Sequence, residues 1–167
     1  MKNLIWFFLL SLSTEIFAQD KIDIEVQSGH LLPITTMEIN PDGTRLVTSS
    51  ADKKIILWDL NSNLQVNSWS LDMGTYVGVV EGLDFNQAGN ILAASSKWAV
   101  AFIDVSNGKF ISTYILPEGR EGGQVQLSAT ENIAYLITNT AVMSSGARYS
   151  ELIILDIKTG SEIKKWN

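Results

Sequence analysis

The stretch Ile55-Ile56-Leu57-Trp58-Asp59-Leu60-Asn61-Ser62-Asn63 decides the fold, because two later segments of the chain repeat its pattern. Each copy has an apolar run, an aspartate, an aliphatic residue, two polar residues and then asparagine or glycine; the later copies are 100–108 (VAFIDVSNG) and 152–160 (LIILDIKTG). A short apolar run that ends at a turn signal predicts a strand buried on both faces. Asparagine and glycine tolerate the positive φ of a tight hairpin. The aspartates of the three copies are 45 and then 52 residues apart, a spacing typical of repeats of one structural unit.

A second turn signal lies upstream of each copy and supplies the rest of the repeat. The three signals are Asn40-Pro41-Asp42-Gly43, Gln87-Ala88-Gly89-Asn90 and Thr130-Glu131-Asn132. We expect a strand before each signal, a strand after it, and a strand that closes each repeat: 35–40, 45–49 and 64–70, then 81–86, 91–95 and 109–115, then 124–129, 133–138 and 162–166. Four antiparallel strands in a repeat of this length predict an all-β chain of three β-propeller blades, at about 28–70, 71–115 and 116–167.

The composition predicts a folded chain that does not bind nucleic acid. Of the 167 residues, 46% are hydrophobic and 18% are charged, and the formal net charge is −6. Such a charge opposes binding to phosphates and, more weakly, to an anionic membrane. The chain has no cysteine and one histidine, so disulfides and thiolate ligands are excluded. We expect no metal site and no cofactor.

The N-terminus has the three parts of a secretory signal peptide. Met1-Lys2-Asn3 is a short positive start, 4–12 (LIWFFLLSL) is almost wholly apolar, and the chain turns polar around Ala18. The apolar run is shorter than the roughly 20 residues of a membrane-spanning helix. We therefore expect residues 1–18 to be a signal peptide, cleaved after Ala18 or Gln19, and residues 19–167 to be secreted or periplasmic and free of the membrane. An uncleaved anchor and a buried helix are the alternatives.

The first repeat resembles the WD-repeat family, in particular its secreted bacterial members. The resemblance rests on Gly29-His30, the turn 40–43, Asp52 and Trp58-Asp59. It implies a hydrogen-bonded tetrad that ties the blade together, with the members His30, Thr48, Asp52 and Trp58. Such a network is chemically reasonable, since a buried imidazole and a buried indole both need hydrogen-bond partners. A histidine, an aspartate and a hydroxyl also make a catalytic triad, but Trp58 has no part in one, so we predict a structural brace and no catalytic residue.

The other two repeats depart from this pattern. In the second repeat, Ile103 takes the tryptophan position, Lys97 the aspartate position and Ala93 the hydroxyl position. In the third, Leu155 and Tyr149 take the tryptophan and aspartate positions. We expect apolar packing alone to hold these two blades.

Three blades are too few for a closed ring, which carries roughly four to eight. A further strand is expected at 21–27 (KIDIEVQ), where apolar and polar residues alternate. In WD-repeat propellers a strand at this place completes the last blade, so the resemblance implies an incomplete ring. We expect the N-terminal fragment of a larger WD-repeat protein, a truncated gene product, or a chain that closes its ring by self-association.

One loop is a candidate binding site. Residues 143–149 (MSSGARY) are an insertion relative to the first repeat and join the two middle strands of the third blade. Loops at blade ends often carry binding residues, so Arg148 and Tyr149 are candidate contact residues; an ordinary hairpin loop is the alternative. The glycine-rich segment 118–123 (EGREGG) lacks the lysine, serine and following helix of a phosphate-binding loop, and we expect a solvated linker.

These observations favour a secreted, non-catalytic scaffold that binds a protein partner of unknown identity. The alternative is the N-terminal part of an enzyme that contains a propeller, for example a caspase-like protease, whose catalytic domain is absent here. An enzyme with its active site in a propeller channel needs several inward-facing carboxylates, histidines or a metal, and the single histidine is already assigned to the brace. A degraded reading frame with no function of its own is a third interpretation.

Overall fold

The computed structural model describes residues 29–71, 78–141 and 148–166. These residues form three four-stranded antiparallel sheets and no helix, which confirms the all-β prediction. No described segment is a helix long and apolar enough to cross a membrane. The predicted signal peptide at 1–18 and the predicted strand at 21–27 lie outside the described residues.

Each sheet is a meander in which strands that follow one another in the chain are hydrogen-bonded neighbours. Sheet one contains β1 (Ile34–Ile39), β2 (Arg45–Ser50), β3 (Lys54–Asp59) and β4 (Leu64–Ser70). Sheet two contains β5 (Val80–Phe85), β6 (Ile91–Ser96), β7 (Ala99–Asp104) and β8 (Lys109–Ile115). Sheet three contains β9 (Arg120–Leu127), β10 (Ile133–Ala141), β11 (Arg148–Asp156) and β12 (Glu162–Trp166). In the first two sheets every strand begins and ends within one residue of its expected position.

The same turn residues occur in each repeat, which explains why the three hairpins at the repeated motif have the same structure. The carboxylate of Asp59 accepts hydrogen bonds from the backbone N–H groups of Asn61 and Ser62, at 2.9 and 2.8 Å. Asp104 and Asp156 make the equivalent contacts in the other two sheets. The residue that ends each turn has a positive φ, namely 58° at Asn63, 71° at Gly108 and 68° at Gly160. The sequence repeat is therefore a repeated hairpin.

The glycine-rich segment 118–123 is not a solvated linker, which corrects the expectation from sequence. Strand β9 begins at Arg120 and includes Gly122 and Gly123. A Cβ atom on Gly122 would lie 2.2 Å from the carbonyl oxygen of Ser96 in β6. The Ser95 hydroxyl donates a hydrogen bond to the carbonyl oxygen of Gly123 over 2.5 Å. Glycine is needed here because the backbone of β9 lies directly against sheet two.

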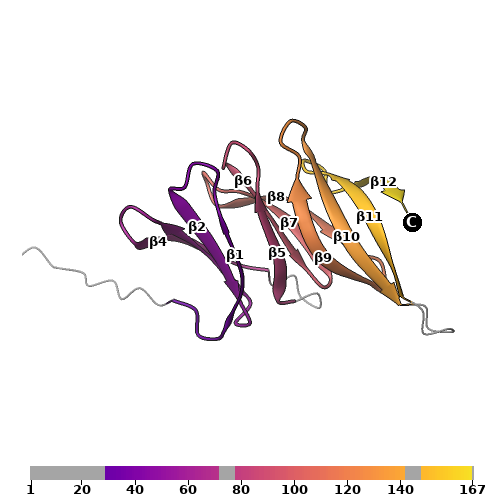
Figure 1. The fold of residues 1–167 in the computed structure, drawn as a ribbon, viewed down its shortest axis with the longest axis horizontal. Coiled ribbons are helices and arrows are strands. Elements are labelled where there is room, and N and C mark those ends of the chain that lie inside the picture. Colours follow the sequence, from indigo (N-terminus) through magenta and orange to yellow (C-terminus); the bar gives the residue numbers. More distant parts are fainter. Residues whose placement is uncertain (1–28, 72–77, 142–147, 167) are drawn as a thin grey trace, which may run out of the picture.

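The three sheets stand side by side in a row, with sheet two in the middle (Figure 1). The first strand of sheet two, β5, contacts the first strands of both neighbours, β1 and β9. Among the described strands, the last strand of each sheet, β4, β8 or β12, pairs with the strand before it and with no other. The row formed by the described residues does not close on itself, so within this part of the chain sheet one and sheet three each have one face without a neighbouring sheet.

Two apolar cores fill the spaces between the sheets. The core between sheets one and two includes Val47, Ile55, Leu57 and Trp69 from sheet one and Leu92, Ala94, Ala101 and Ile103 from sheet two. The core between sheets two and three includes Ala93, Val100 and Phe102 from sheet two and Ala134, Leu136, Ile153 and Leu155 from sheet three. Sheet two is buried on both faces, which is why β7 is apolar from Ala99 to Ile103 and why even the two serines that end β6 are buried.

The strand register shows which positions in the three sheets are equivalent. Trp58 pairs with Leu46 across β2 and β3, and Ile103 pairs with Leu92 across β6 and β7. Counting two residues along the middle strand from each pair places Ala94 at the position of Thr48. The sequence assignment of Ala93 to the hydroxyl position was therefore wrong, because the β6–β7 hairpin is one residue shorter than the β2–β3 hairpin.

Candidate functional site

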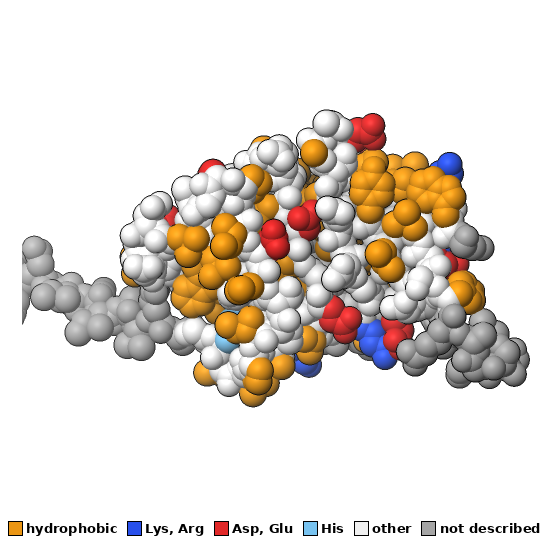
Figure 2. Space-filling model, viewed as in Figure 1, with side chains coloured by type: hydrophobic (Ala, Val, Ile, Leu, Met, Phe, Trp, Pro, Cys, Tyr) orange, Lys and Arg blue, Asp and Glu red, His pale blue; other side chains and the backbone are white. Residues whose placement is uncertain are grey.

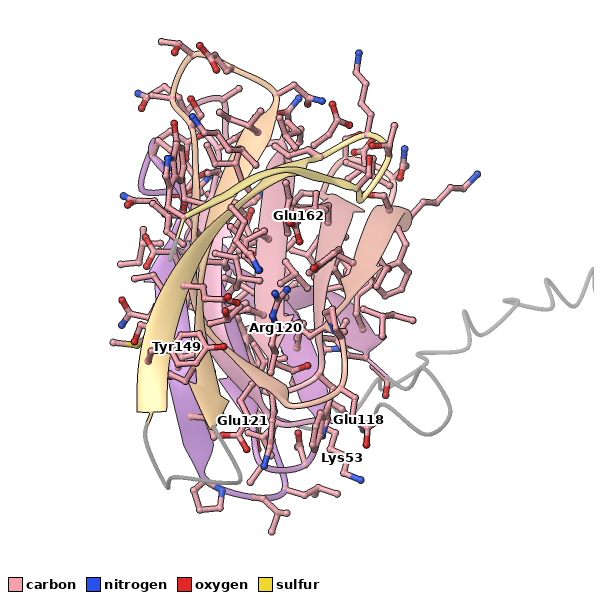
Figure 3. The ribbon with its side chains drawn as sticks, turned by 90° about the vertical axis from the view of Figure 1, so that its right-hand side faces the viewer. Lys53, Glu118, Arg120, Glu121, Tyr149 and Glu162 are labelled. Atoms are coloured by element: carbon pink, nitrogen blue, oxygen red, sulfur yellow. The ribbon has the colours of Figure 1, made fainter. Side chains whose placement is uncertain are left out.

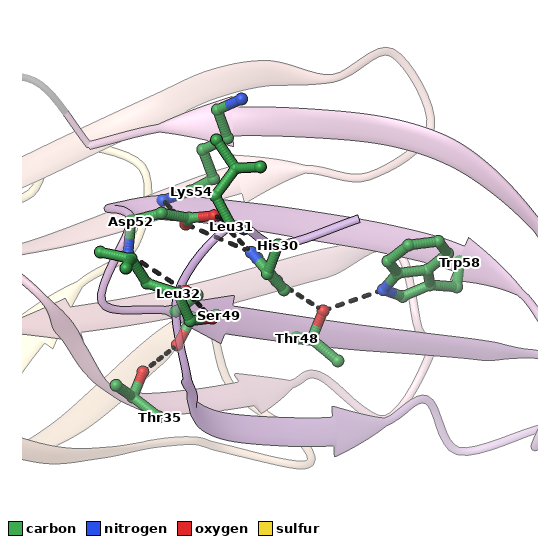
Figure 4. A network of polar contacts seen from close by, with 10 residues as sticks. His30, Leu31, Leu32, Thr35, Thr48, Ser49, Asp52, Lys54 and Trp58 are labelled. Carbon is green, nitrogen blue, oxygen red and sulfur yellow. Dashed lines mark hydrogen bonds and ion pairs between the residues drawn. The ribbon is translucent and has the colours of Figure 1, made fainter. Parts of the chain in front are cut away.

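The structure brings His30, Thr48, Asp52 and Trp58 together in one hydrogen-bonded network (Figure 4). His30 Nδ1 lies 3.2 Å from both carboxylate oxygens of Asp52. His30 Nε2 lies 2.9 Å from the Thr48 hydroxyl oxygen, and the indole N–H of Trp58 donates to the same oxygen over 2.9 Å. The network links the segment before β1 to β2, to the β2–β3 turn and to β3, so it spans most of sheet one.

The donors and acceptors of the network fit one neutral tautomer of His30. An indole nitrogen can only donate, so the Thr48 oxygen accepts from Trp58 and its own hydrogen is free to point at His30 Nε2. Nδ1 of His30 then carries the proton and donates it toward Asp52. Every polar atom of the four side chains thereby has a partner, as burial requires.

The carboxylate of Asp52 is held in place by backbone groups as well as by His30. The N–H groups of Leu31 and Lys54 donate to it over 2.9 and 3.0 Å. Burial alone would raise the pKa of Asp52, but these two N–H groups and His30 outweigh it and hold the pKa below its usual range. Only 6% of the Asp52 side chain and 4% of the His30 side chain are exposed.

In this geometry the network is a structural brace, and Thr48 is not placed to act as the nucleophile of a catalytic triad. A nucleophile must reach a substrate, but Thr48 is 4% exposed and its oxygen already accepts from Trp58. Two neighbouring hydroxyls make a separate contact with sheet two: Thr35 Oγ1 lies 2.9 Å from the Ser49 hydroxyl oxygen and donates to the Val80 carbonyl oxygen in β5 over 2.9 Å.

Sheet three has a buried ionic cluster where sheet one has the brace, so the expectation of apolar packing alone was wrong for this sheet. Glu151, which is 3% exposed, faces Arg120 Nε at 2.8 Å and Lys165 Nζ at 3.1 Å. Arg120 also lies 3.8 Å from Glu162, to which the Tyr114 hydroxyl of sheet two donates over 3.0 Å. The cluster therefore joins β9, β11 and β12 to β8 of the neighbouring sheet.

One signal in the sequence pointed to this cluster. Glu151 lies two residues before Ile153 and four before Leu155, both fully buried, so it belongs to the same buried face of β11. In Figure 3, Arg120 and Glu162 lie in the middle of the molecule, whereas Glu118, Glu121 and Lys53 lie at one end of the sheets. Glu121 forms a second pair between sheets, with Lys97 at 2.8 Å, but both side chains are over 40% exposed.

A hollow of about 540 Å³ lies along the first strands of the three sheets. Its lining includes three carboxylates, Glu38, Glu81 and Asp84, and two amides, Gln124 and Gln126. Burial raises the pKa of Asp84, although the N–H of Leu127 donates to it over 2.5 Å. Burial, and then the Asp84 charge, raise the pKa of Glu38. The hollow is thus a surface rich in acceptors, and sequence reasoning did not find it because its residues come from three separate repeats.

The two candidate loop residues are in fact strand residues. β11 begins at Arg148, so Arg148 and Tyr149 are its first two residues. Tyr149 is 44% exposed; the side chain of Arg148 and residues 143–147 lie outside what the structure describes. Among residues 29–71, 78–141 and 148–166, no group of three or more histidine, aspartate or glutamate side chains is arranged to hold a metal ion.

Comparison with known proteins identifies the repeat and the fold. Residues 23–59 match the family model "WD domain, G-beta repeat". Among solved structures, the chain is similar to the β-propeller domain of Cps50 (Swd1) from Myceliophteria thermophila, with 17% identity, a TM-score of 0.62, and coverage of 84% of this chain and 39% of that one. It is also similar to the RRP9 WD40 repeats and to U3-55K, each with 12% identity, a TM-score of 0.59 and coverage of 77% of this chain; it covers 46% and 47% of those chains.

No curated protein matches the chain significantly. The chain spans less than half of the length of each solved propeller named above. At such low identity the structural likeness speaks for the fold alone. Residues 23–59 thus carry a WD repeat, and the three sheets have the fold of WD40 β-propeller blades.

Proposed function

We propose that this chain is a non-catalytic scaffold that binds protein partners through the hollow along its first strands. The observation that carries the proposal is the position of this hollow: β1, β5 and β9 each contribute to it, and the hydrogen-bonded brace lies elsewhere. His30, the one histidine of the chain, already has a partner at each ring nitrogen. The WD repeat at 23–59 supports an interaction role.

The chemistry of the hollow favours a basic partner segment. Glu38, Glu81 and Asp84 offer carboxylate oxygens, and Gln124 and Gln126 add amide groups. The pKa values of Glu38 and Asp84 are raised mainly by burial, so in the free chain the cost of burying these two carboxylates is not fully offset by nearby hydrogen-bond donors or positive charges. A lysine or arginine side chain would relieve this, and charge-assisted hydrogen bonds are the stronger kind.

Partner capture tests the proposal. The purified chain is immobilised, exposed to secreted and periplasmic proteins of its source cells, and the retained proteins are identified by mass spectrometry. Substituting Glu38→Gln and Glu81→Gln together should remove most of the retained proteins. The matched control, Glu118→Gln with Glu131→Gln, changes the net charge equally at exposed positions outside the hollow and should retain them. Equal retention by both double variants, or catalytic turnover by the purified chain, would contradict the proposal.

We further propose that the chain is exported and is part of a larger WD-repeat protein of the secreted bacterial type. The support for export is the signal-peptide pattern of residues 1–18. The support for a larger protein is the count of three sheets, below the roughly four to eight of closed propellers.

Two experiments test export and length. N-terminal sequencing of the exported protein should give a first residue of Gln19 or Asp20. Continued blade patterns in the downstream DNA would support a longer scaffold, and a caspase-like domain there would favour the alternative, the N-terminal part of an enzyme.

A further inference from the structure

The turn between β7 and β8 carries the one Asn-Gly pair of the sequence, Asn107-Gly108. In the equivalent turns of sheets one and three, the same two places are occupied by Ser62-Asn63 and Thr159-Gly160. An asparagine that precedes glycine can react with its own backbone, because glycine has no Cβ atom to hinder the N–H group that follows the asparagine. Of the three turns, the middle one alone therefore combines the two residues that this reaction needs.

The reaction is deamidation of the asparagine, and its only co-reactant is water. The backbone nitrogen of Gly108 attacks Cγ of Asn107, so that a C–N bond forms and the bond from Cγ to Nδ2 breaks. The proton of the attacking nitrogen ends on the leaving group, which departs as ammonia. Water then opens the five-membered succinimide ring at one of its two C–N bonds. One product has an aspartate at position 107; the other has an isoaspartate, in which the backbone runs through the former side chain.

The folded turn holds both reacting groups in hydrogen bonds. The N–H of Gly108 donates to the carbonyl oxygen of Asp104 over 2.8 Å. The side-chain amide of Asn107 donates to the Asp104 carboxylate over 2.8 Å, and its oxygen accepts from the N–H of Lys109 over 2.9 Å. The attack needs a free Gly108 nitrogen and an Asn107 side chain turned back toward it, so these three hydrogen bonds must break first. The rate of reaction in the folded chain is therefore set by how often the turn opens.

Opening of this turn is linked to the contact between sheets one and two. Trp69 of β4 belongs to the core between these sheets, and its indole N–H donates to the Gly108 carbonyl oxygen over 2.8 Å. Asn67 of the same strand lies so close that a Cβ atom on Gly108 would overlap its side-chain nitrogen. Sheet one thus holds the turn closed from outside, in addition to the hydrogen bonds within the turn.

Solvent reaches the turn although β4 covers one side of it. The side chain of Asn107 is exposed. The N–H of Val105, two residues earlier, donates to the carbonyl oxygen of Asn90 in the β5–β6 turn, so both turns lie at the same end of the sheets (Figure 1). Figure 2 shows this end, at the top of the view, as open surface with more uncharged polar side chains and backbone than charged side chains. Water and hydroxide are therefore at hand when the turn opens.

We propose that Asn107 is a modification site, and that its deamidation permanently loosens the contact between sheets one and two. An aspartate at this position replaces an amide donor with a second carboxylate beside that of Asp104. An isoaspartate adds one carbon atom to the main chain before Gly108, so that Gly108 no longer meets the Asp104 carbonyl oxygen and the Trp69 indole together. Neither product lets the turn close as before. The inference goes beyond the proposed scaffold function and does not depend on it.

Peptide mapping of the ageing chain tests the site. The purified full chain is kept in mildly alkaline buffer, and samples are digested with trypsin, whose cleavage after Lys97 and Lys109 releases residues 98–109. Mass spectrometry should find aspartate and isoaspartate at the position of Asn107, and little conversion of Asn61, which precedes a serine in the equivalent turn. In the chain unfolded by guanidinium chloride, conversion of Asn107 should be at least about tenfold faster, because the three hydrogen bonds no longer oppose it.

Two variants test the link to the sheets. Trp69→Phe keeps an aromatic ring and removes the indole donor, so the folded chain should deamidate about fivefold faster, with no change in guanidinium chloride. Asn107→Gln blocks the reaction, because its longer side chain would have to close a six-membered ring, which forms far more slowly. After ageing, the urea midpoint of the wild type should fall and that of Asn107→Gln should stay constant. Circular dichroism verifies that the fresh variants are folded; Trp69→Leu and Asn107→Ser serve where they are not.

Three results would overturn the inference. Conversion of Asn61 as fast as that of Asn107 would show that the Asn-Gly pair is not a preferred site. Equal rates in the folded wild type and in folded Trp69→Phe would show that sheet one does not hold the turn closed. A urea midpoint that stays constant while Asn107 is converted would show that the modification leaves the contact between the sheets intact.

Discussion

The indole nitrogen of Trp58 lies 2.9 Å from the hydroxyl oxygen of Thr48, so a side-chain hydrogen bond ties β3 to β2 in addition to the backbone ladder. The same oxygen lies 2.9 Å from His30 Nε2, which makes Thr48 the centre of the brace. Removing this one hydroxyl should therefore disturb two partners at once.

Thr48→Val should lower the free energy of unfolding by about 2 kcal/mol, because it keeps the shape of the side chain but leaves Nε2 of His30 and the indole nitrogen of Trp58 without a partner. Trp58→Phe removes one donor and should cost about 1 kcal/mol, and Trp58→Ala about 3 kcal/mol, since a cavity is added. Urea melts measure all three. If the double variant Thr48→Val with Trp58→Phe loses the sum of the single losses, the two residues are not coupled and the brace is refuted.

The brace should make the free energy of unfolding depend on pH in the acidic range. The pKa of Asp52 lies below its usual range in the folded chain, so its contribution is fully present above the unfolded value, about 3.9, and is lost as the pH falls through the folded value. The difference in unfolding free energy between the wild type and Asp52→Asn should therefore be largest near neutral pH and shrink as the pH falls below about 4. Urea melts across this range measure it; a difference that stays constant would speak against an ionised Asp52 in the brace.

Asp84 should behave in the opposite way. Burial raises its pKa, so the charged form opposes folding at neutral pH and protonation removes this penalty as the pH falls through the raised value. Asp84→Asn keeps an acceptor for the Leu127 N–H and should raise the unfolding free energy near pH 7 by less than about 1 kcal/mol, because solvent screens the half-buried group. The gain should vanish in acid. Glu81→Gln, an exposed charge in the same hollow, should show little gain.

Gly122 should tolerate no side chain. A Cβ atom there would lie 2.2 Å from the Ser96 carbonyl oxygen, so Gly122→Ala must push β9 away from sheet two. We expect a loss of unfolding free energy of roughly 3 kcal/mol, since overpacking shifts the backbone. Gly29→Ala is the matched control, because its Cβ atom would meet Trp58 at an ordinary 3.9 Å. Equal thermal midpoints for the two variants would contradict the close approach of β9 to β6.

Among the charged residues of sheet three, Glu151 should be the one whose substitution lowers the free energy of unfolding most. Glu151→Gln leaves Arg120 and Lys165 facing a neutral group in a buried place and should lower the unfolding free energy by about 3 kcal/mol. Glu121→Gln removes one partner of the exposed pair with Lys97 and should cost at most about 1 kcal/mol. Chemical denaturation of both variants measures the contrast, and similar losses would show that the cluster is not effectively buried.

Local pattern was sufficient for most of the strands. The apolar runs, the aspartates and the positive-φ residues at the turns predict the hairpins of sheets one and two to within one residue, because a hairpin forms between residues that are close in the chain. The tetrad residues were found through the resemblance of the first repeat to a known family. Arg148 and Tyr149 were placed in a loop, but β11 extends to include them, since long strands continue to pair beyond their apolar centre.

The sequence by itself determined that this chain is all-β and built of three like hairpin units, because turn chemistry and apolar alternation act over a few residues. Only the tertiary structure decided what lies between the units. Gly122 packs against Ser96, Glu151 is buried beside Arg120, and the Trp69 indole donates to the Gly108 carbonyl oxygen. The residues in each of these contacts are 26 to 39 apart in the chain. Such contacts are set by how whole sheets stack to bury their faces, and no local pattern records which side chains that stacking brings together.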